Sequence, residues 1–455
     1  MAALVAEEVA LGGWGVCWAS AILFSLTSVP GWFQALLLRP DMPAIWVDVF
    51  LGLLGFLVIL RRPGIPALVL LCATQVVQVA LLLPEVPNHR MILALANLAF
   101  LAAALRRTRG SVFDGYVPVA RAIVVIVYLF AFFAKLNRDF LDPASSCAAQ
   151  FYDSAARWWP LLPDVAPARQ AAIFGTLAAE AVLPLGLCWK PSRRAAVAVG
   201  LVFHFMLALD TTHNFVNFSA VMSALLVLFL PRGFLDSLGQ AFDPSRSVRT
   251  MLAGGLLAVL LSGLLAATNW SAYAIVYLWT RQLVWSTYAI MLSGAAILWR
   301  GQEEGPCRRP RPSLAGLAIL GLTVLNGLGP YLGLKTRAAF DMYSNLRVEA
   351  DRSNHLIVPR SLDVLGVLRD RVTILETSDP TLRVKYADPG YEITYFELAS
   401  RVRESRDMRV RYVRSGEEHE YDSKRGDSLE APSFWLRKFL MFRPLGERSR
   451  AQCVW

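Results

Sequence analysis

The chain is dominated by apolar blocks of the length that crosses a lipid bilayer. Between residues 13 and 334 they follow one another with short polar loops, and over the whole chain 55% of residues are hydrophobic and 18% charged. A hydrocarbon core about 30 Å thick takes roughly 20 apolar residues as a helix. The blocks therefore predict a mainly α fold, a polytopic transmembrane helix bundle of about 9–11 spans. The expected spans are 13–30, 43–60, 65–83, 91–105, 119–136, 170–189, 195–210, 215–231, 251–267, 282–299 and 313–334.

Basic residues in the loops predict the orientation of the bundle. The loops expected on one side of the bilayer contain fifteen Lys and Arg residues, and the alternate loops contain six. Because cytoplasmic loops carry the excess of Lys and Arg, the N-terminus is expected in the cytoplasm and the C-terminal segment outside. Most of the net charge of +10 lies in these loops. We therefore expect the lipid bilayer as a partner, and no nucleic acid.

The C-terminal segment reads as a separate soluble domain. A transmembrane domain over residues 1–334 is expected to precede a small extracytoplasmic α+β domain over residues 335–455. Alternation of apolar and polar residues predicts strands at 371–376, 382–387 and 408–413. Residues 393–405 have a helical pattern, and the aromatic, basic stretch 433–442 could lie on the bilayer surface.

Polar side chains inside or at the ends of the apolar blocks are the candidate functional residues, because such groups are costly at membrane depth. Among them are Asp48, Lys135, Glu180, His204, Asp210, His213 and Asn217, the last beside Asn214. A lysine desolvated near lipid can become a base near pH 7, and a nearby histidine can relay a proton.

Structural interpretations of the same residues stay open. Lys135 at a helix end could extend to the head groups, and Glu180 could hydrogen-bond a neighbouring helix. His204 could be a satisfied interior histidine. The loop residues Asp210 and His213 could be solvated, while Asp48 is too isolated to assign.

The six cysteines show no metal-type spacing, and the five histidines are dispersed, so no metal site is expected. Cys147 and Cys453 could share the outer compartment, which makes a disulfide between them possible. Cys17, Cys72 and Cys188 lie in apolar blocks, where we expect them to pack.

Three segments resemble a known family. FAKLNRDFL at 133–141 resembles the lysine-bearing segment of the vitamin K-dependent γ-carboxylases and of the wider HTTM (horizontally transferred transmembrane) domain proteins. The stretch 203–231 is similar to the family's histidine helix, with His204 at the histidine position. The stretch 340–359 resembles the segment after the last span, which leads to a strand containing a histidine, here His355.

The resemblance implies an integral membrane enzyme that uses reduced vitamin K or menaquinone, a hydroquinone, with O2 and CO2 as co-substrates. Lys135 would deprotonate the hydroquinone, with His204 as the second catalytic residue. Oxygen would then generate a strong base that removes a γ-proton from a substrate glutamate, and CO2 would add to the resulting carbanion. The cofactor-binding residues that we expect are the candidates Glu180, Asp210, His213 and Asn217, together with His355 from the third similar segment.

The resemblance also implies partners and a location. The partners would be a lipid quinone and a glutamate-containing peptide or protein on the outer face. The C-terminal segment is far shorter than the luminal region of the eukaryotic carboxylases, which favours a bacterial cell membrane and no propeptide site.

Three other functions remain as alternatives. The first is a quinone-dependent oxidoreductase or quinone-binding protein without carboxylation, which would still use Lys135 and His204. The second is a transporter with Lys135, Glu180 and Asp210 along its path, although no inverted repeat is apparent. The third is a membrane-anchored binding module whose C-terminal domain carries the function.

Overall fold

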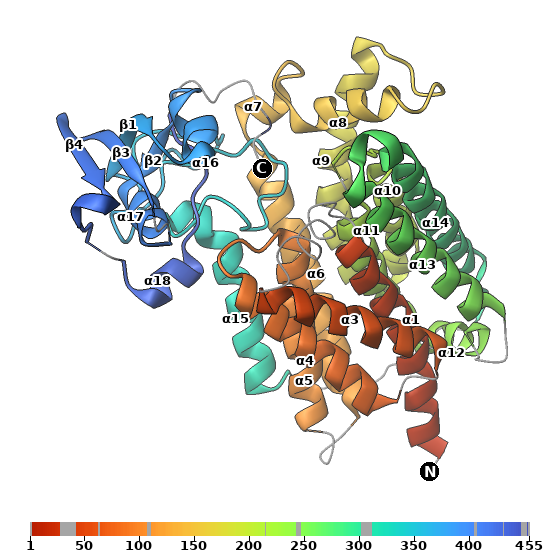
Figure 1. Cartoon of the computed structure of the whole chain (residues 1–455). Coiled ribbons are helices and arrows are strands. Elements are labelled where there is room, and N and C mark those ends of the chain that lie inside the picture. The colour runs from red at the N-terminus through yellow and green to blue at the C-terminus, as the bar shows by residue number, and fades with distance from the viewer. Residues whose placement is uncertain are drawn as a thin grey trace.

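The structure is a computed structural model of the 455-residue chain, and Figure 1 shows a helical bundle with a small sheet beside it. It describes residues 2–27, 42–61, 64–106, 111–213, 215–242, 247–301, 312–404, 407–430, 432–446 and 453. The first half of the bundle consists of α1 (Ala2–Thr27), α3 (Pro43–Leu60), α4 (Ile65–Leu82), α5 (Asn88–Leu105), α6 (Val112–Lys135), α7 (Arg138–Leu141) and α8 (Cys147–Ala156). The second half consists of α9 (Ala166–Cys188), η2 (Lys190–Ser192), α10 (Arg193–Leu207), α11 (Phe215–Leu226), η3 (Val227–Phe229), α12 (Arg232–Ala241), α13 (Ser247–Thr268), α14 (Trp270–Leu298) and α15 (Leu314–Leu332).

Each of the eleven expected spans falls on a helix of the described chain, but not every helix has the properties of a span. Eight helices are long and apolar enough to cross a membrane, a number compatible with a multi-pass membrane protein and lower than the 9–11 expected. Three expected spans fall on helices outside this set: α10, which has 15 residues, the segment Phe215–Phe229, and α14. The expected span 282–299 begins in the middle of α14, because the first half of that helix is rich in Trp and Tyr and contains Arg281.

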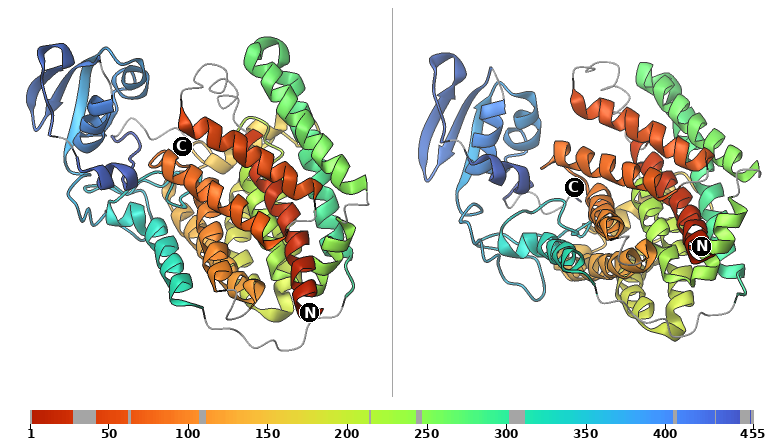
Figure 2. Two further views of the ribbon diagram at one scale, coloured as in Figure 1. Left: turned by 60° about the horizontal axis from the view of Figure 1, so that its bottom comes forward. Right: turned by 90° about the horizontal axis from the view of Figure 1, so that it is seen from below.

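The first helix is the centre of the bundle. Within its segment Val9–Thr27, 94% of the residues are buried, against 33–56% in the other candidate spans. Close packing at Gly13 explains part of this burial, because a Cβ there would lie 2.6 Å from the backbone nitrogen of Gly239 on α12. Figure 2 shows α1 running between α3 and the helices of the second half.

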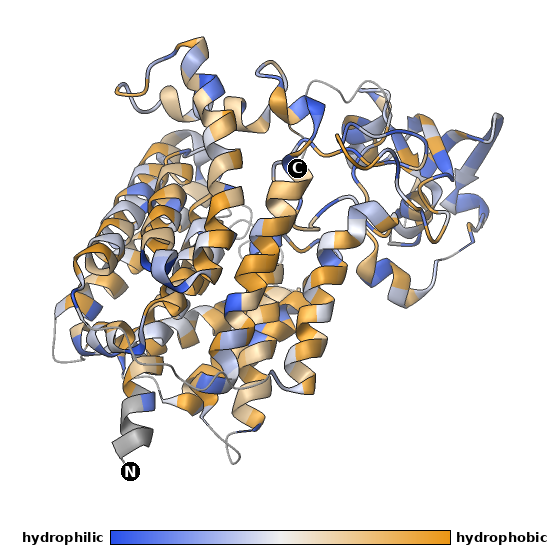
Figure 3. Ribbon diagram, turned by 180° about the vertical axis from the view of Figure 1, so that it is seen from behind, coloured by the Kyte–Doolittle hydropathy of each residue, from blue (hydrophilic) through white to orange (hydrophobic). Residues whose placement is uncertain are grey.

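The outer faces of the bundle are apolar. Large hydrophobic side chains are exposed along α3, for example Leu53 and Leu57, and along α13, for example Leu257 and Leu261. Figure 3 shows this contrast, with hydrophobic colouring along the bundle helices and more hydrophilic colouring on the sheet. A helix packed on a water-soluble protein would present polar residues on such faces, so lipid is the physically suitable surrounding.

The C-terminal sheet has four antiparallel strands in the order β2-β1-β3-β4. Its elements are β1 (Arg371–Thr377), α16 (Pro380–Leu382), η4 (Arg383–Ala387), β2 (Glu392–Thr394), α17 (Tyr395–Glu404), β3 (Arg409–Arg414), β4 (Glu417–Asp422), η5 (Ser423–Arg425) and α18 (Phe434–Phe439). The predicted strands at 371–376 and 408–413 and the helical pattern at 393–405 are confirmed within a few residues. The sheet has a hydrophobic core of its own, separate from that of the bundle.

The predicted strand at 382–387 is wrong. Asp379 caps this segment by accepting a hydrogen bond from the Leu382 N–H, and Pro380 begins the short helix α16. The buried residues Leu382 and Tyr386 are four apart, which is the spacing of one helical face, and not of a strand.

The segment between α15 and β1 joins the two parts of the molecule. Residues of this segment pair with the end of α6 through the Asn137–His355 bridge and the hydrogen bond from the Leu356 N–H to the Leu136 carbonyl. A disulfide between Cys147 and Cys453, with Cα atoms 5.1 Å apart, ties the end of the chain to α8. The pairing that the sequence left open is therefore present in the structure.

Candidate functional site

Lys135 is the last residue of α6, and its ammonium group is directed into the protein. The side chain is only 5% exposed. Its Nζ donates to Glu180 Oε1 at 2.9 Å and to the Met342 carbonyl at 3.0 Å, and lies 3.5 Å from the Ala131 carbonyl. An ammonium has three N–H donors, so these contacts occupy all of them. Lys135 therefore does not extend toward head groups in this structure.

Glu180 belongs to α9 and is held by a single cation. Its Oε1 accepts the hydrogen bond from Lys135, while its Oε2 is buried and has no hydrogen-bond partner among the described residues. A buried carboxylate oxygen without a partner is costly. It is therefore a candidate acceptor for a proton.

His204 belongs to α10 and is fully buried. Its Nε2 lies 2.7 Å from the Tyr128 hydroxyl, and the rings of Phe203 and Phe218 pack at 5.3 Å. Its Nδ1 has no hydrogen-bond partner within the described ranges. Only one of the two ring nitrogens of His204 thus has a hydrogen-bond partner among the described residues, whereas both are normally bonded in an interior histidine.

Lys135, Glu180 and His204 line one small cavity of about 50 Å³, which we call the lysine cavity. The three residues come from three helices, and the rest of the wall is mostly apolar and aromatic, including Phe140, whose ring centre lies 5.8 Å from Lys135 Nζ. Charges interact more strongly in such surroundings than in water. The arrangement can therefore hold or transfer a proton without bulk water.

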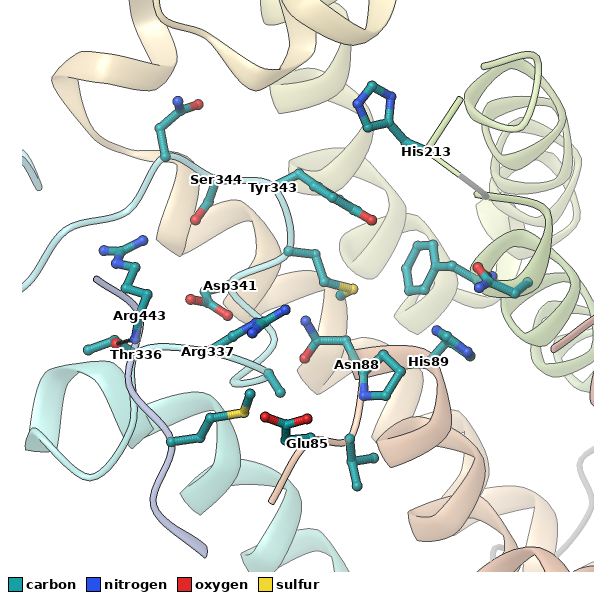
Figure 4. A pocket seen from close by; sticks show the side chains of 18 residues that line it. Glu85, Asn88, His89, His213, Thr336, Arg337, Asp341, Tyr343, Ser344 and Arg443 are labelled. Carbon is teal, nitrogen blue, oxygen red and sulfur yellow. Dashed lines mark hydrogen bonds between the residues drawn. The ribbon is translucent and has the colours of Figure 1, made fainter. Parts of the chain in front are cut away.

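A larger cavity of about 390 Å³ adjoins the lysine cavity, and we call it the arginine cavity. The two share three lining residues, Phe218, Met342 and Tyr343. Its walls are the turn Glu85–His89 before and at the start of α5, the region from His213 to Phe218, and two segments that follow the bundle, 336–345 and 441–443. Figure 4 shows these segments converging on the cavity.

The loop 336–345 has an unusual backbone. Four residues other than glycine have positive φ angles between 50° and 59°: Ala338, Phe340, Tyr343 and Asn345. Such conformations persist only where the surroundings impose them, and they concentrate at functional sites.

Side chains from the bundle impose the shape of this loop. Asn88 Oδ1 accepts from the Phe340 N–H at 2.9 Å. The fully buried Asn137, two residues after Lys135, donates to the Ser344 carbonyl at 2.6 Å. These contacts place the carbonyl of Met342 against Lys135, so the same loop forms a wall of both cavities.

Asp210, His213 and Asn217 lie beside the arginine cavity. Asp210 is buried and accepts hydrogen bonds from Ser154 Oγ at 3.0 Å and from the Thr212 N–H at 2.8 Å. Its Oδ2 lies 2.6 Å from Nδ1 of His213. His213 and Asn217 line the cavity, whereas Asp210 positions His213 from behind.

His355 lines neither cavity. Its Nδ1 accepts from the N–H groups of Ile357 and Val358, at 3.0 and 3.1 Å, and its Nε2 lies 2.9 Å from the Phe133 carbonyl. Burial lowers the pKa of His355, and the bond to Phe133 opposes that shift. His355 therefore supports the end of α6 and lies outside the walls of both cavities.

Burial also perturbs the cations of the arginine-cavity wall. It lowers the pKa of Arg443, and the carboxylate of Asp341 opposes the shift. Beside the cavity, burial lowers the pKa of Lys335 to about 8, again against Asp341. Because desolvation disfavours the charged form of Arg443, an anion bound in the cavity would stabilise that form.

Sequence reasoning missed several residues of this region. Tyr128 could have been found, because it lies seven residues before Lys135 and so on the same face of α6. Arg337 and Arg443 gave no signal, since they lie in ordinary polar sequence and line the same cavity only in the folded chain. Asp48 lies outside both cavities and accepts a hydrogen bond from Gln78 within the bundle.

Neither similarity to known proteins nor a group of metal-binding side chains indicates a function for the chain. No protein-family model, curated protein or solved structure matches the chain. Within the described ranges, no group of three or more His, Cys, Asp or Glu residues is arranged to hold a metal ion.

Proposed function

We propose that the protein is a multi-pass membrane enzyme that removes a proton from a lipid-soluble hydroquinone at the Lys135–Glu180 pair, in a reaction of the vitamin K-dependent γ-carboxylase type. The observation that carries the proposal is this pair, joined at 2.9 Å in the wall of a mostly apolar cavity. Buried ion pairs are poor stabilisers, because apolar residues of the same size often serve as well or better. Ionisable residues at membrane depth are therefore functional candidates by default.

The two residues act as one unit. Lys135 holds Oε1 of Glu180, which leaves Oε2 as the atom that accepts a proton. After that transfer Lys135 remains positive beside the place from which the proton left, and it stabilises negative charge there. His204 lines the same cavity, and its Nδ1, which has no hydrogen-bond partner among the described residues, offers a second point of proton exchange.

The residues fit a hydroquinone by their chemistry. A proton acceptor, a cation and aromatic walls suit a flat ring that carries acidic hydroxyl groups. The lysine cavity alone, at about 50 Å³, is much smaller than the roughly 300–1,000 Å³ of ligand pockets. The arginine cavity, at about 390 Å³, lies within that range. Residues of the shared wall, Phe218, Met342 and Tyr343, would hold the ring, and the flexible Met342 is the side chain best able to adapt.

Reduced vitamin K or menaquinone, when bound, would supply the proton to be removed and, with O2, the strong base that prepares a glutamate for CO2. The contribution of the chain is to accept a proton at Glu180, to hold positive charge at Lys135 and to exclude water. The apolar wall favours that exclusion.

Three observations support a membrane location with the C-terminal domain outside. The helices expose apolar side chains on their outer faces. Basic residues are concentrated in the loops assigned to the cytoplasm. The disulfide between Cys147 and Cys453 lies on the side assigned to the exterior, where oxidising conditions maintain such bonds.

The test compares hydroquinone oxidation by purified variants in lipid nanodiscs. Lys135→Met and Glu180→Gln should each reduce epoxide formation from reduced vitamin K or menaquinone at least about a hundredfold, the lower range for losing a positioned acid–base group. Lys335→Met is the matched control, because Lys335 is also a largely buried lysine but lines neither cavity. Wild-type turnover in Lys135→Met, or an equal loss in the control, would remove the pair from the reaction.

A further inference from the structure

Helix α18 of the C-terminal segment exposes its aromatic residues and shields its charges. Phe434, Trp435 and Phe439 are each more than half exposed, and Trp435 reaches 70%. Arg437 and Lys438 are half-buried, and their cationic groups lie 6.0 and 5.9 Å from the ring centre of Phe434. A helix that faces water has the opposite arrangement, with its charges outermost and its aromatic rings inside. The exposed face of α18 is therefore suited to apolar surroundings.

This exposure is concentrated in α18 and is not a general property of the C-terminal domain. Among the described residues from β1 onward, six large hydrophobic side chains are exposed, and four of them belong to α18. Single exposed hydrophobic residues are normal on a protein surface, whereas a group of them marks an interaction site. The six residues of α18 form such a group.

The position of α18 relates it to the membrane-spanning part of the chain. Lys438 Nζ donates to the Leu83 carbonyl at 2.9 Å, one residue beyond the end of α4. Two residues after α18, Met441 pairs with Lys335, which follows the end of α15. Both α4 and α15 are long and apolar enough to cross a membrane. Figure 1 shows α18 beside the C-terminal end of α15, which is the level at which a bilayer surface would lie.

A second exposed apolar segment lies at the same end of the bundle. Leu362 and Leu365 are both exposed, and the Leu362 N–H donates to the Tyr331 carbonyl in the last turn of α15. Leu368 of this segment belongs to the same small hydrophobic core as Leu440, the residue directly after α18. The two exposed segments are thus held near each other at the end of α15.

We propose that α18 is an interfacial anchor, which lies in the surface of the lipid leaflet at the C-terminal ends of α4 and α15. Phe434, Trp435 and Phe439 would enter the boundary between head groups and acyl chains, about 5–10 Å deep, as amphipathic helices do. Arg437 and Lys438 would lie in the head-group layer, since long cationic side chains extend to it from apolar surroundings. Trp is enriched at this level of membrane proteins.

Lipid is the occupant that the surrounding surface favours. α15 ends beside α18 and exposes apolar side chains up to its last turns, for example Leu325 and Leu328. The lipid that covers α15 would therefore continue onto α18. The contact is independent of the hydroquinone reaction, because no residue of α18 lines either cavity.

The experiment measures the depth of α18 with spin labels on full-length protein in phosphatidylcholine nanodiscs. Trp435→Cys and Phe439→Cys are each labelled in a Cys188→Ser background, which removes the exposed free cysteine. Oxygen concentrates in lipid and a charged nickel chelate stays in water, so the effect of each reagent on the label reports its surroundings. We expect both labels to be more accessible to oxygen than to the chelate. Ser415→Cys, in the exposed turn between β3 and β4, is the matched control and should show the reverse.

Two results would overturn the anchor. The first is an accessibility to the chelate at positions 435 and 439 that equals that of the control, since α18 would then face water. The second is a low accessibility to both reagents that rises when each nanodisc holds a single chain, which would assign the face to a second copy of this protein. Thermal unfolding of each labelled variant confirms that it remains folded, and the two positions test the same face independently.

Discussion

The Lys135–Glu180 pair should show a large energetic coupling. Both side chains are nearly buried, and Nζ and Oε1 are 2.9 Å apart. Lys135→Met leaves a buried carboxylate with neither oxygen bonded, and Glu180→Leu leaves an ammonium with only the carbonyl groups of Met342 and Ala131. Each single substitution should lower the free energy of unfolding by about 3–5 kcal/mol, and the double variant should recover most of that loss. The coupling energy should therefore be at least about 2 kcal/mol.

The assay is denaturant-induced unfolding in mixed micelles, followed by the fluorescence of the buried tryptophans Trp14, Trp18 and Trp285. The control cycle uses Arg169 and Asp153, a pair at 2.7 Å whose side chains are 32% and 42% exposed. That pair should show a coupling below about 1 kcal/mol. Additive losses at Lys135 and Glu180, or a coupling no larger than that of the exposed pair, would refute the reasoning.

Three further predictions concern the segment after α15 and the orientation of the chain. Burial lowers the pKa of His355, so its contribution to stability should be complete above about pH 6.5 and should be lost as the pH falls through the lower folded-state value. Wild-type melting temperature should therefore depend on pH more steeply below 6.5 than that of His355→Gln, and parallel profiles would contradict this. Mass spectrometry of unreduced protein should find Cys147 linked to Cys453, and Cys453→Ser should cost about 2–4 kcal/mol of stability; alkylation of both cysteines without reductant would disprove the link. In a Cys188→Ser background, Ser415→Cys should react with an impermeant thiol reagent on intact cells, whereas labelling only after lysis would reverse the proposed orientation.

The helical part of the fold was predictable because apolar runs of membrane length have few structural solutions. Each expected span corresponds to a helix of the described chain, including the three that are not among the eight candidate membrane-spanning helices. The C-terminal domain was harder to predict. The edge strand β4 is mostly charged, and its Glu420 pairs with Arg409 on β3, so the apolar alternation that reveals a strand is missing there.

The individual residues of the lysine cavity were predictable from the sequence, but the fact that they line one cavity was not. Lys135, Glu180 and His204 each stand out as polar groups inside apolar blocks. Their meeting depends on how α6, α9 and α10 pack, and the hydropathy pattern contains no information on that packing. The arginine cavity was beyond prediction for a similar reason. The segments that contain Arg337 and Arg443 come together only in the folded chain, through hydrogen bonds of the Thr336 N–H and of its hydroxyl.

The most direct test of the proposed reaction incubates purified wild-type protein in lipid with chemically reduced vitamin K or menaquinone, a glutamate-containing peptide, O2 and labelled CO2. The proposed reaction predicts both quinone epoxide and acid-stable label in the peptide, with neither product formed by Lys135→Met. Epoxide without label would retain hydroquinone oxygenation and contradict glutamate carboxylation. Failure to form either product with either quinone would contradict the assignment of the Lys135–Glu180 pair to hydroquinone chemistry.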